Sequence, residues 1–134
     1  MHGDYEKAHR LSSVTIGAAI EVHREKGAGL IESIYEKCLK RELELRGVCA
    51  ETQVEVQVEY KGLVFDECLR LDLIVENCVI VELKAVQDVL PVHKAQLLSY
   101  MKLLDIPVGL LFNFHEVLLK DGLHRMLLPG ADGR

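Results

Sequence analysis

The chain has 134 residues, of which 49% are hydrophobic and 28% are charged, a composition typical of a globular protein. At this length we expect one domain, over residues 1–134, that buries about two-thirds of the surface of its unfolded chain and needs no disulfide. The net charge of −5 disfavours a broad basic surface that binds nucleic acid non-specifically, so any phosphate binding has to be local or mediated by a metal.

Two helices are predicted in the N-terminal third of the chain. Apolar residues recur at spacings of three and four over residues 8–26, and the glycines of Gly27-Ala28-Gly29 end this helix. A second apolar stripe predicts a helix over residues 30–46, which ends at Gly47. Glu32 borders the inward face of this second helix instead of pointing cleanly to water.

Three strands are predicted to follow and to form an antiparallel meander. Residues 53–60 alternate strictly between polar and apolar, as in a half-buried strand. Lys61-Gly62 makes a tight hairpin turn, because glycine adopts positive φ without strain, and it leads into a strand that ends near Val75. A second hairpin, over residues 70–84, completes the meander.

A crossover helix and a buried strand are predicted in the last third of the chain. Residues 93–104 have helical periodicity, and residues 108–114 are a nearly continuous apolar run, as in a strand that is buried on both faces. A last strand is expected near residues 124–128 and a frayed tail over 130–134. The predicted fold class is α/β, bordering on α+β, with a mixed central sheet flanked by helices and a core over about residues 8–128.

Cysteine usage and the N-terminus indicate a cytoplasmic protein with reduced thiols. The four cysteines form no C-x-x-C pair, which argues against a zinc knuckle and a thioredoxin-like site, and we expect them to be core residues. They are Cys38, Cys49, Cys68 and Cys78. The N-terminus lacks the basic and then apolar layout of a signal peptide, and no run of about 18 apolar residues is present to span a membrane.

Charged residues stand in the apolar hairpin over residues 70–84, where a plain core strand would carry neutral ones. If three residues centred on Asn77 connect its strands, Asp72 lies opposite Glu82, with Cβ atoms about 4.5–5.5 Å apart. Like charges this close destabilise a sheet unless a proton or a cation lies between them. A divalent metal is the simplest resolution, with Lys84 as a third charged group beside it.

The pattern of Asp72 followed by Glu82-Leu83-Lys84 after a hairpin resembles the PD-(D/E)XK nuclease superfamily, whose restriction-endonuclease-like core has a helix, three meander strands, a helix and a further strand. Nearly the whole chain is also similar to the small bacterial and archaeal GxxExxY family. The matching stretches are Val22-His23, Gly29 to Tyr35, Arg70 to Leu73, Val81 to Val86, Gln96 to Tyr100 and Gly109 to Phe114. Ala28 stands where that family has proline, a departure that affects only the turn.

This resemblance implies a metal site and a hydrolytic reaction. Asp72 and Glu82 would bind Mg²⁺ or Mn²⁺ with the help of the Leu83 carbonyl, and Glu32 would reach the metal directly or through water. Metal-activated water would then attack a phosphodiester bond, and Lys84 would stabilise the growing charge or position the water. The implied substrate is nucleic acid, with DNA ahead of RNA, and a homodimer would supply a second site.

Three further residues are candidates for substrate binding. Gln96 and Tyr100 lie four residues apart on one helical face, and we expect them to converge with Glu32 on the same face of the sheet. Arg70 would screen the carboxylates or meet a phosphate, with an ion pair as the equal alternative.

Each proposed role has a structural alternative. The charged residues of the hairpin over residues 70–84 could form a salt-bridge cluster without metal, and Glu32 could accept hydrogen bonds at a helix start. Tyr35, His23 and His93 are further candidates for the site, since Tyr35 lies one turn from Glu32 and His93 would share the face of Gln96 and Tyr100. Alternatively, Tyr35 could be a core aromatic with a satisfied hydroxyl, His23 could pack beneath the site, and His93 could be a helix-start or surface residue. For the whole chain, the alternative is a catalytically silent nuclease fold that serves as a nucleic-acid or protein interaction module.

Overall fold

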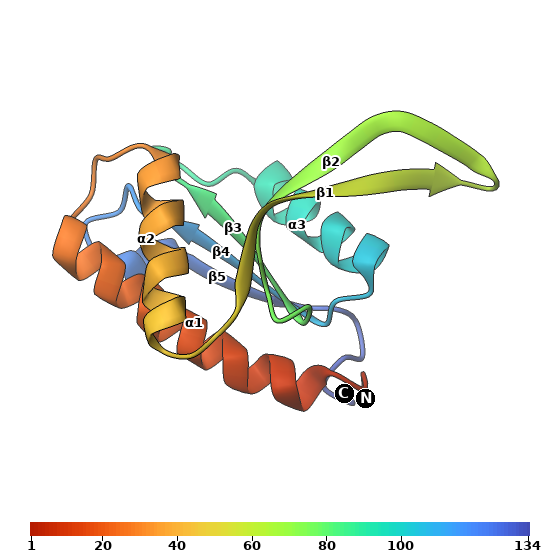
Figure 1. Ribbon diagram of the computed structural model, residues 1–134, viewed down its shortest axis with the longest axis horizontal. Helices are drawn as coiled ribbons and strands as arrows, with labels where there is room; N and C mark the ends of the chain where they lie inside the picture. The colour runs from red at the N-terminus through yellow and green to blue at the C-terminus, as the bar shows by residue number, and fades with distance from the viewer.

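The computed structural model describes all of residues 1–134 and contains three α-helices, five strands and one short 3-10 helix (Figure 1). In chain order the elements are α1 (Tyr5–Lys26), α2 (Glu32–Leu45), β1 (Ala50–Tyr60), β2 (Leu63–Val75), β3 (Val79–Lys84), α3 (Pro91–Leu104), β4 (Val108–Asn113), η1 (Leu119–Gly122) and β5 (Leu123–Leu127). The predicted order and type of the helices and strands are confirmed. The boundaries shift by a few residues, since α1 begins at Tyr5 and β1 at Ala50.

The five strands form one mixed sheet in the order β1-β2-β3-β4-β5. Neighbouring strands are antiparallel except β3 and β4, which are parallel. The helix α3 connects these two strands, because parallel neighbours cannot be joined by a tight turn. All six residues of β4 are buried, as expected of a central strand that is covered on both faces. The α/β class with a mixed sheet is therefore confirmed.

The helices cover opposite faces of the sheet. The core on one face joins α1 and α2 to the sheet and includes Ala18, Val22, Tyr35, Leu39, Leu43, Val81 and Leu83. The core on the other face joins α3 to the sheet and includes Ile80, Leu97, Tyr100, Met101 and Leu111. The expectation that Glu32 converges with Gln96 and Tyr100 on one face is therefore wrong. Because the crossover helix occupies one face, the amphipathic pair α1 and α2 has to cover the other.

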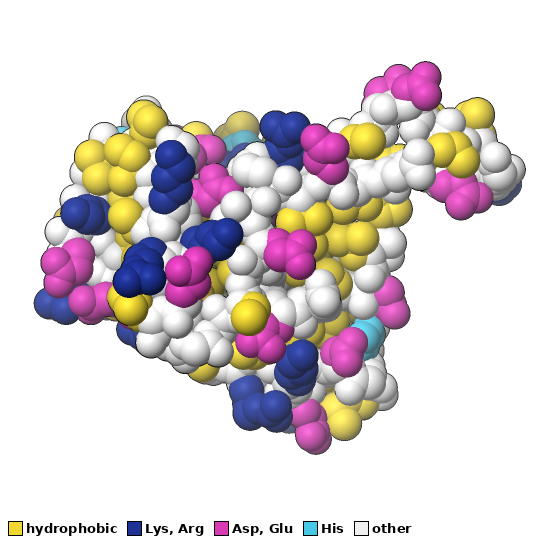
Figure 2. All heavy atoms as spheres, in the orientation of Figure 1, with side chains coloured by type: hydrophobic (Ala, Val, Ile, Leu, Met, Phe, Trp, Pro, Cys, Tyr) yellow, Lys and Arg dark blue, Asp and Glu magenta, His cyan; other side chains and the backbone are white.

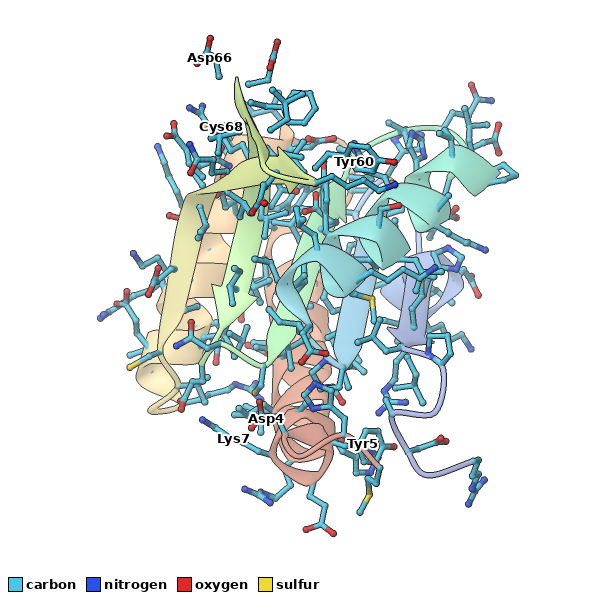
Figure 3. All side chains as sticks on the ribbon, turned by 90° about the vertical axis from the view of Figure 1, so that its right-hand side faces the viewer. Asp4, Tyr5, Lys7, Tyr60, Asp66 and Cys68 are labelled. Carbon is cyan, nitrogen blue, oxygen red and sulfur yellow. The ribbon has the colours of Figure 1, made fainter.

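The hairpin of β1 and β2 extends beyond the sheet as an arm, residues 57–68, which stands away from the body of the molecule in Figure 1. Its turn has left-handed backbone at Lys61 (φ 47°) and Gly62 (φ 87°), as predicted for a tight hairpin. Figure 3 shows Tyr60 and Cys68 of this arm at the end of the molecule opposite the start of α1. The large apolar residues at the tip are exposed: Tyr60 (61%), Leu63 (58%) and Val64 (56%).

The cysteines differ in part from expectation. All four are free thiols, but Cys49 and Cys68 are exposed and Cys38 is half-buried. Only Cys78 lies in the core, where burial raises the pKa of its thiol. The prediction of core cysteines is wrong for Cys49 and Cys68, because one precedes an edge strand and the other lies on the arm.

The C-terminal residues are held against the start of the chain. Ala131 is buried, and its carbonyl accepts a hydrogen bond of 2.9 Å from the backbone N–H of His2. The two chain ends accordingly lie next to each other in Figure 1. The expectation of a frayed tail is therefore wrong at Ala131. None of the helices is long and apolar enough to cross a membrane.

Candidate active site

The candidate site lies where β2 and β3 separate. The two strands pair through Val75 with Val79, Ile74 with Ile80 and Leu73 with Val81. This register centres the connection on Asn77, as predicted, and Glu76 and Asn77 both adopt left-handed φ angles, 45° and 59°. When this strand register is continued by one residue, Asp72 lies across from Glu82.

Side-chain hydrogen bonds replace the backbone ladder at this point. The backbone N–H of Leu83 donates to Asp72 Oδ2 at 2.8 Å, and the backbone N–H of Asp72 donates more weakly to Glu82 Oε1 at 3.5 Å. Asp72 is therefore anchored through Oδ2, while its Oδ1 makes no hydrogen bond to the backbone. The predicted proximity of the two carboxylates is present in the structure.

Glu82 is the buried member of this pair, with only 7% of its surface exposed. Burial raises the pKa of Glu82 to about 8, and the neighbouring charge of Asp72 raises it further in the same direction, while Lys84 acts weakly against them. In the chain alone, Glu82 therefore holds a proton at neutral pH. A bound cation could replace this proton and relieve the repulsion between the carboxylates of Asp72 and Glu82.

Lys84 ends β3 and lies two residues after Glu82, on the same side of the strand. Its side chain is half-buried. None of the salt bridges in the structure includes Asp72, Glu82 or Lys84. The alternative of a salt-bridge cluster in this hairpin is therefore wrong.

Glu32 approaches the site from α2. It is the first residue of that helix, and its Oε1 accepts a hydrogen bond of 3.2 Å from the backbone N–H of Ala85, just after β3. Glu32 and Asp72 line one cavity of about 280 Å³, whose other lining residues are Ser33, Glu36, Gln53 and Leu83. No three His, Cys, Asp or Glu side chains lie close enough together to hold one ion. The structure thus brings Asp72 close to Glu82 and places Glu32 and Asp72 in the lining of one cavity, which Glu82 does not line.

Tyr100 approaches the carboxylates from α3, on the face of the sheet opposite to α2. Its side chain is buried, and burial raises the pKa of its phenol, with further contributions from Glu82 and Asp72. Tyr100 therefore remains a protonated hydrogen-bond donor near the pair. Gln96, one turn earlier on α3, is exposed.

Arg70 turns away from the site. Its guanidinium donates to Glu55 Oε1 at 2.9 Å, across the pairing of β2 with β1, and both side chains are more than half exposed. Arg70 therefore forms the ion pair named above as an alternative, with Glu55 as the partner, and does not screen Asp72 or Glu82.

Three residues of the N-terminal and α3 motifs have structural roles. The Tyr35 hydroxyl donates to the Gly27 carbonyl at 2.6 Å and accepts from the backbone N–H of Leu30 at 3.0 Å. His23 Nε2 donates to the Glu116 carbonyl at 2.8 Å. The backbone N–H of Leu90 donates to His93 Nδ1 at 3.0 Å, which closes the start of α3. The structural alternative is the one that these contacts favour for Tyr35, His23 and His93.

Asn113 was assigned no role from the sequence, yet it holds the segment that follows Lys84. It is fully buried, its Oδ1 accepts from the backbone N–H groups of Val86 (3.1 Å) and His115 (3.3 Å), and its Nδ2 donates to the Val86 carbonyl at 2.8 Å. The available signal was one polar residue at the end of the apolar run of β4.

Charge on the visible face of the molecule is mixed. Figure 2 shows Lys and Arg side chains interspersed with Asp and Glu, and acidic side chains on the projecting arm. This face therefore carries no broad basic patch.

Comparisons with known proteins identify one family. A family model described as the PD-(D/E)XK nuclease superfamily matches residues 9–126. The crystal structure of SSO0001 is 26% identical in sequence and covers 70% of this chain and 47% of that one, with a TM-score of 0.49. The chain therefore spans about half the length of that protein. No curated protein matches.

Proposed function

Because the chain belongs to the PD-(D/E)XK nuclease superfamily, we propose that it is a nuclease that depends on Mg²⁺ or Mn²⁺ and hydrolyses phosphodiester bonds of nucleic acid, in the manner of the GxxExxY family. The observation that carries this proposal is the approach of Asp72 and Glu82 where β2 and β3 separate, with Lys84 two residues further along β3.

The donors at this point suit a hard divalent cation. Asp72 has one carboxylate oxygen that is not committed to the backbone, and the Leu83 carbonyl is the neighbouring backbone oxygen. Glu82 holds a proton in the chain alone, and loss of that proton would provide a second carboxylate. Mg²⁺ is commonly held by one or two carboxylates, with waters and substrate phosphate completing its shell, so this set fits it. Glu32 would act across the cavity through water.

The cation, when bound, would polarise the phosphodiester and lower the pKa of water. Residues of the chain would stabilise developing charge and bind the substrate. The Lys84 ammonium would stabilise negative charge that develops on the phosphate. Tyr100 remains protonated at neutral pH and would donate a hydrogen bond to the substrate.

The direct test is incubation of the purified protein with single-stranded, duplex and branched DNA and RNA in Mg²⁺ or Mn²⁺. We expect cleavage by the wild type, loss of cleavage in Asp72→Ala and Glu82→Ala, and a loss of about 100-fold in Lys84→Ala. Glu67→Ala, which removes an exposed acidic residue on the arm, should cleave as well as the wild type. The proposal is wrong if the wild type cuts none of the substrates, or if the Asp72 and Glu82 variants cut as well as it does.

A catalytically silent nuclease fold that binds nucleic acid or protein is the second candidate. The observation on its side is that no three His, Cys, Asp or Glu side chains converge on one point, although two carboxylates with water can hold Mg²⁺. Binding of nucleic acid without cleavage, unchanged in Asp72→Ala, would favour it over the nuclease.

A further inference from the structure

Gln53 has an unusual backbone for a residue inside a strand. Its φ angle is +51°, in the left-handed region, although it lies within β1. The neighbouring pairs are Thr52 with Leu73 and Val54 with Leu71, so Gln53 stands across from Asp72. A left-handed conformation costs free energy for every residue except glycine, and it persists only where other contacts hold it.

The contact that holds Gln53 reaches to α2. Gln53 Nε2 donates a hydrogen bond of 2.9 Å to Glu36 Oε1. Glu36 lies one helical turn after Glu32, and residues four apart share a helix face. Gln53, Glu36, Glu32 and Asp72 line the same cavity. The Gln53 side chain therefore joins the strand beside Asp72 to the helix that carries Glu32.

On the core side, the start of α2 is held by Tyr35, whose ring stacks on Phe114, but on the side of the cavity it has few restraints. The residue before the helix, Ile31, provides no side-chain cap, and Glu32 itself is exposed and bound to the sheet through one hydrogen bond of 3.2 Å to Ala85. First turns without a cap leave backbone N–H groups without partners and fray readily. The bond from Gln53 to Glu36 fixes α2 one turn further on.

We propose that Gln53 is a positioning residue for the metal site, which sets the separation between Glu32 and Asp72 across the cavity through its bond to Glu36. The inference rests on the proposed function, because it assigns these carboxylates to a divalent cation. Gln53 acts on the ion only through them. Outer residues that orient ligands typically change metal affinity by about 10-fold to 100-fold when they are removed.

Two substitutions at Gln53 separate positioning from folding. Gln53→Ala removes the carboxamide and keeps the strained backbone, whereas Gln53→Gly removes it and relieves the strain. With Mn²⁺ as the probe, calorimetric titration of the full chain should show affinity lowered by about 10-fold in both variants. Melting without metal should show Gln53→Gly to be at least as stable as Gln53→Ala.

Substitutions at Glu36 test the route of the effect. Glu36→Gln keeps an oxygen that accepts from Gln53, so its Mn²⁺ affinity should stay within about threefold of the wild type, since mainly a screened charge is lost. Glu36→Ala should lower the affinity as Gln53→Ala does, and the double variant should lose no more than either. Gln57→Ala is the matched control, because Gln57 is also an exposed glutamine on β1 and lies an even number of residues from Gln53.

The outcomes distinguish this inference from the proposed function. If Gln53→Ala and Gln53→Gly bind Mn²⁺ as the wild type does while Asp72→Ala does not, the positioning role is wrong and the metal site stands. If Glu36→Gln loses as much affinity as Glu36→Ala, charge and not the hydrogen bond is responsible, and the role is again wrong. If the wild type binds no Mn²⁺, both proposals are wrong.

Discussion

At the scale of single residues, the chemistry of the site depends on the burial of Glu82. A carboxyl group that is 7% exposed and faces Asp72 is held in its protonated form by lost hydration and by a like charge. The hydrogen bond that the Asp72 carboxylate accepts from the backbone N–H of Leu83 holds that residue in place and does not remove the repulsion. Ionisation of Glu82 at high pH therefore lowers the free energy of unfolding, and a bound cation could offset this loss.

The pH dependence of stability should reveal this cost. The pKa of Glu82 rises from 4.5 to about 8 on folding, so between these values the folded chain binds one more proton than the unfolded chain. The stabilisation that this proton provides is complete below about pH 4.5 and is lost as the pH rises through about 8. Each pKa unit corresponds to about 1.4 kcal/mol, so the total loss is on the order of a few kcal/mol.

Urea unfolding in EDTA at pH 5 and pH 8 measures this effect. From pH 5 to pH 8, the unfolding free energy of the wild type should fall by a few kcal/mol because Glu82 loses its proton. Glu82→Gln should lack this fall, because a neutral amide has no proton to lose. A difference between variant and wild type that is the same at both pH values would contradict the assignment.

Asn113 gives a second prediction at this scale. Asn113→Ala removes three hydrogen bonds around Val86 and His115 from a fully buried position, so we expect a loss of about 2–4 kcal/mol in unfolding free energy. Cleavage should also fall at temperatures where the variant is fully folded, because Val86 follows Lys84 by two residues. Phe112→Leu is the control: it weakens the same core, and its cleavage rate should match that of the wild type.

At the scale of elements, the connection between α1 and α2 is held by one side chain. The Tyr35 hydroxyl joins the Gly27 carbonyl to the backbone N–H of Leu30, and its ring stacks on Phe114 with centroids 4.3 Å apart. The connection reaches Glu32 only two residues later, and the Tyr35 ring, stacked on Phe114, holds the start of α2 against the core. The conformation of a loop is here determined by a residue on the helix that follows it.

Tyr35→Phe separates the two parts of this contact. It keeps the stacked ring and removes the hydroxyl, which leaves two backbone groups without their partner, and we expect a loss of about 1–3 kcal/mol in urea unfolding. Mn²⁺ affinity should change little, since the variant keeps the stacked ring that holds the start of α2 against the core. Loss of metal binding with unchanged stability would instead assign Tyr35 to the site.

At the scale of the whole molecule, the arm is the part that contributes least to either core. Its tip carries exposed apolar residues, and Figure 2 shows it projecting clear of the rest of the surface. Exposed residues bury little apolar area, and their removal costs little stability. The arm therefore contributes little to the stability of the fold.

Shortening the arm tests this statement. Gln57 and Cys68 are paired across β1 and β2, so a two-residue Asn-Gly turn can replace residues 58–67 between them. We expect the melting temperature of this variant to stay within about 5 °C of the wild type. A fall of more than about 10 °C would show that the arm supports the fold.

Local patterns in the sequence determined the elements and the central pairing of this protein. Periods of two and of three to four residues predicted the strands and helices, and a three-residue turn centred on Asn77 placed Asp72 against Glu82, because turn length sets hairpin register. Only the tertiary structure decided that α2 and α3 cover opposite faces, that Arg70 pairs with Glu55, and that Gln53 reaches Glu36 from a left-handed backbone. These features depend on contacts between separate elements, whose partners no local period specifies, and the burial that holds a proton on Glu82 exists only once both layers of helices close over the sheet.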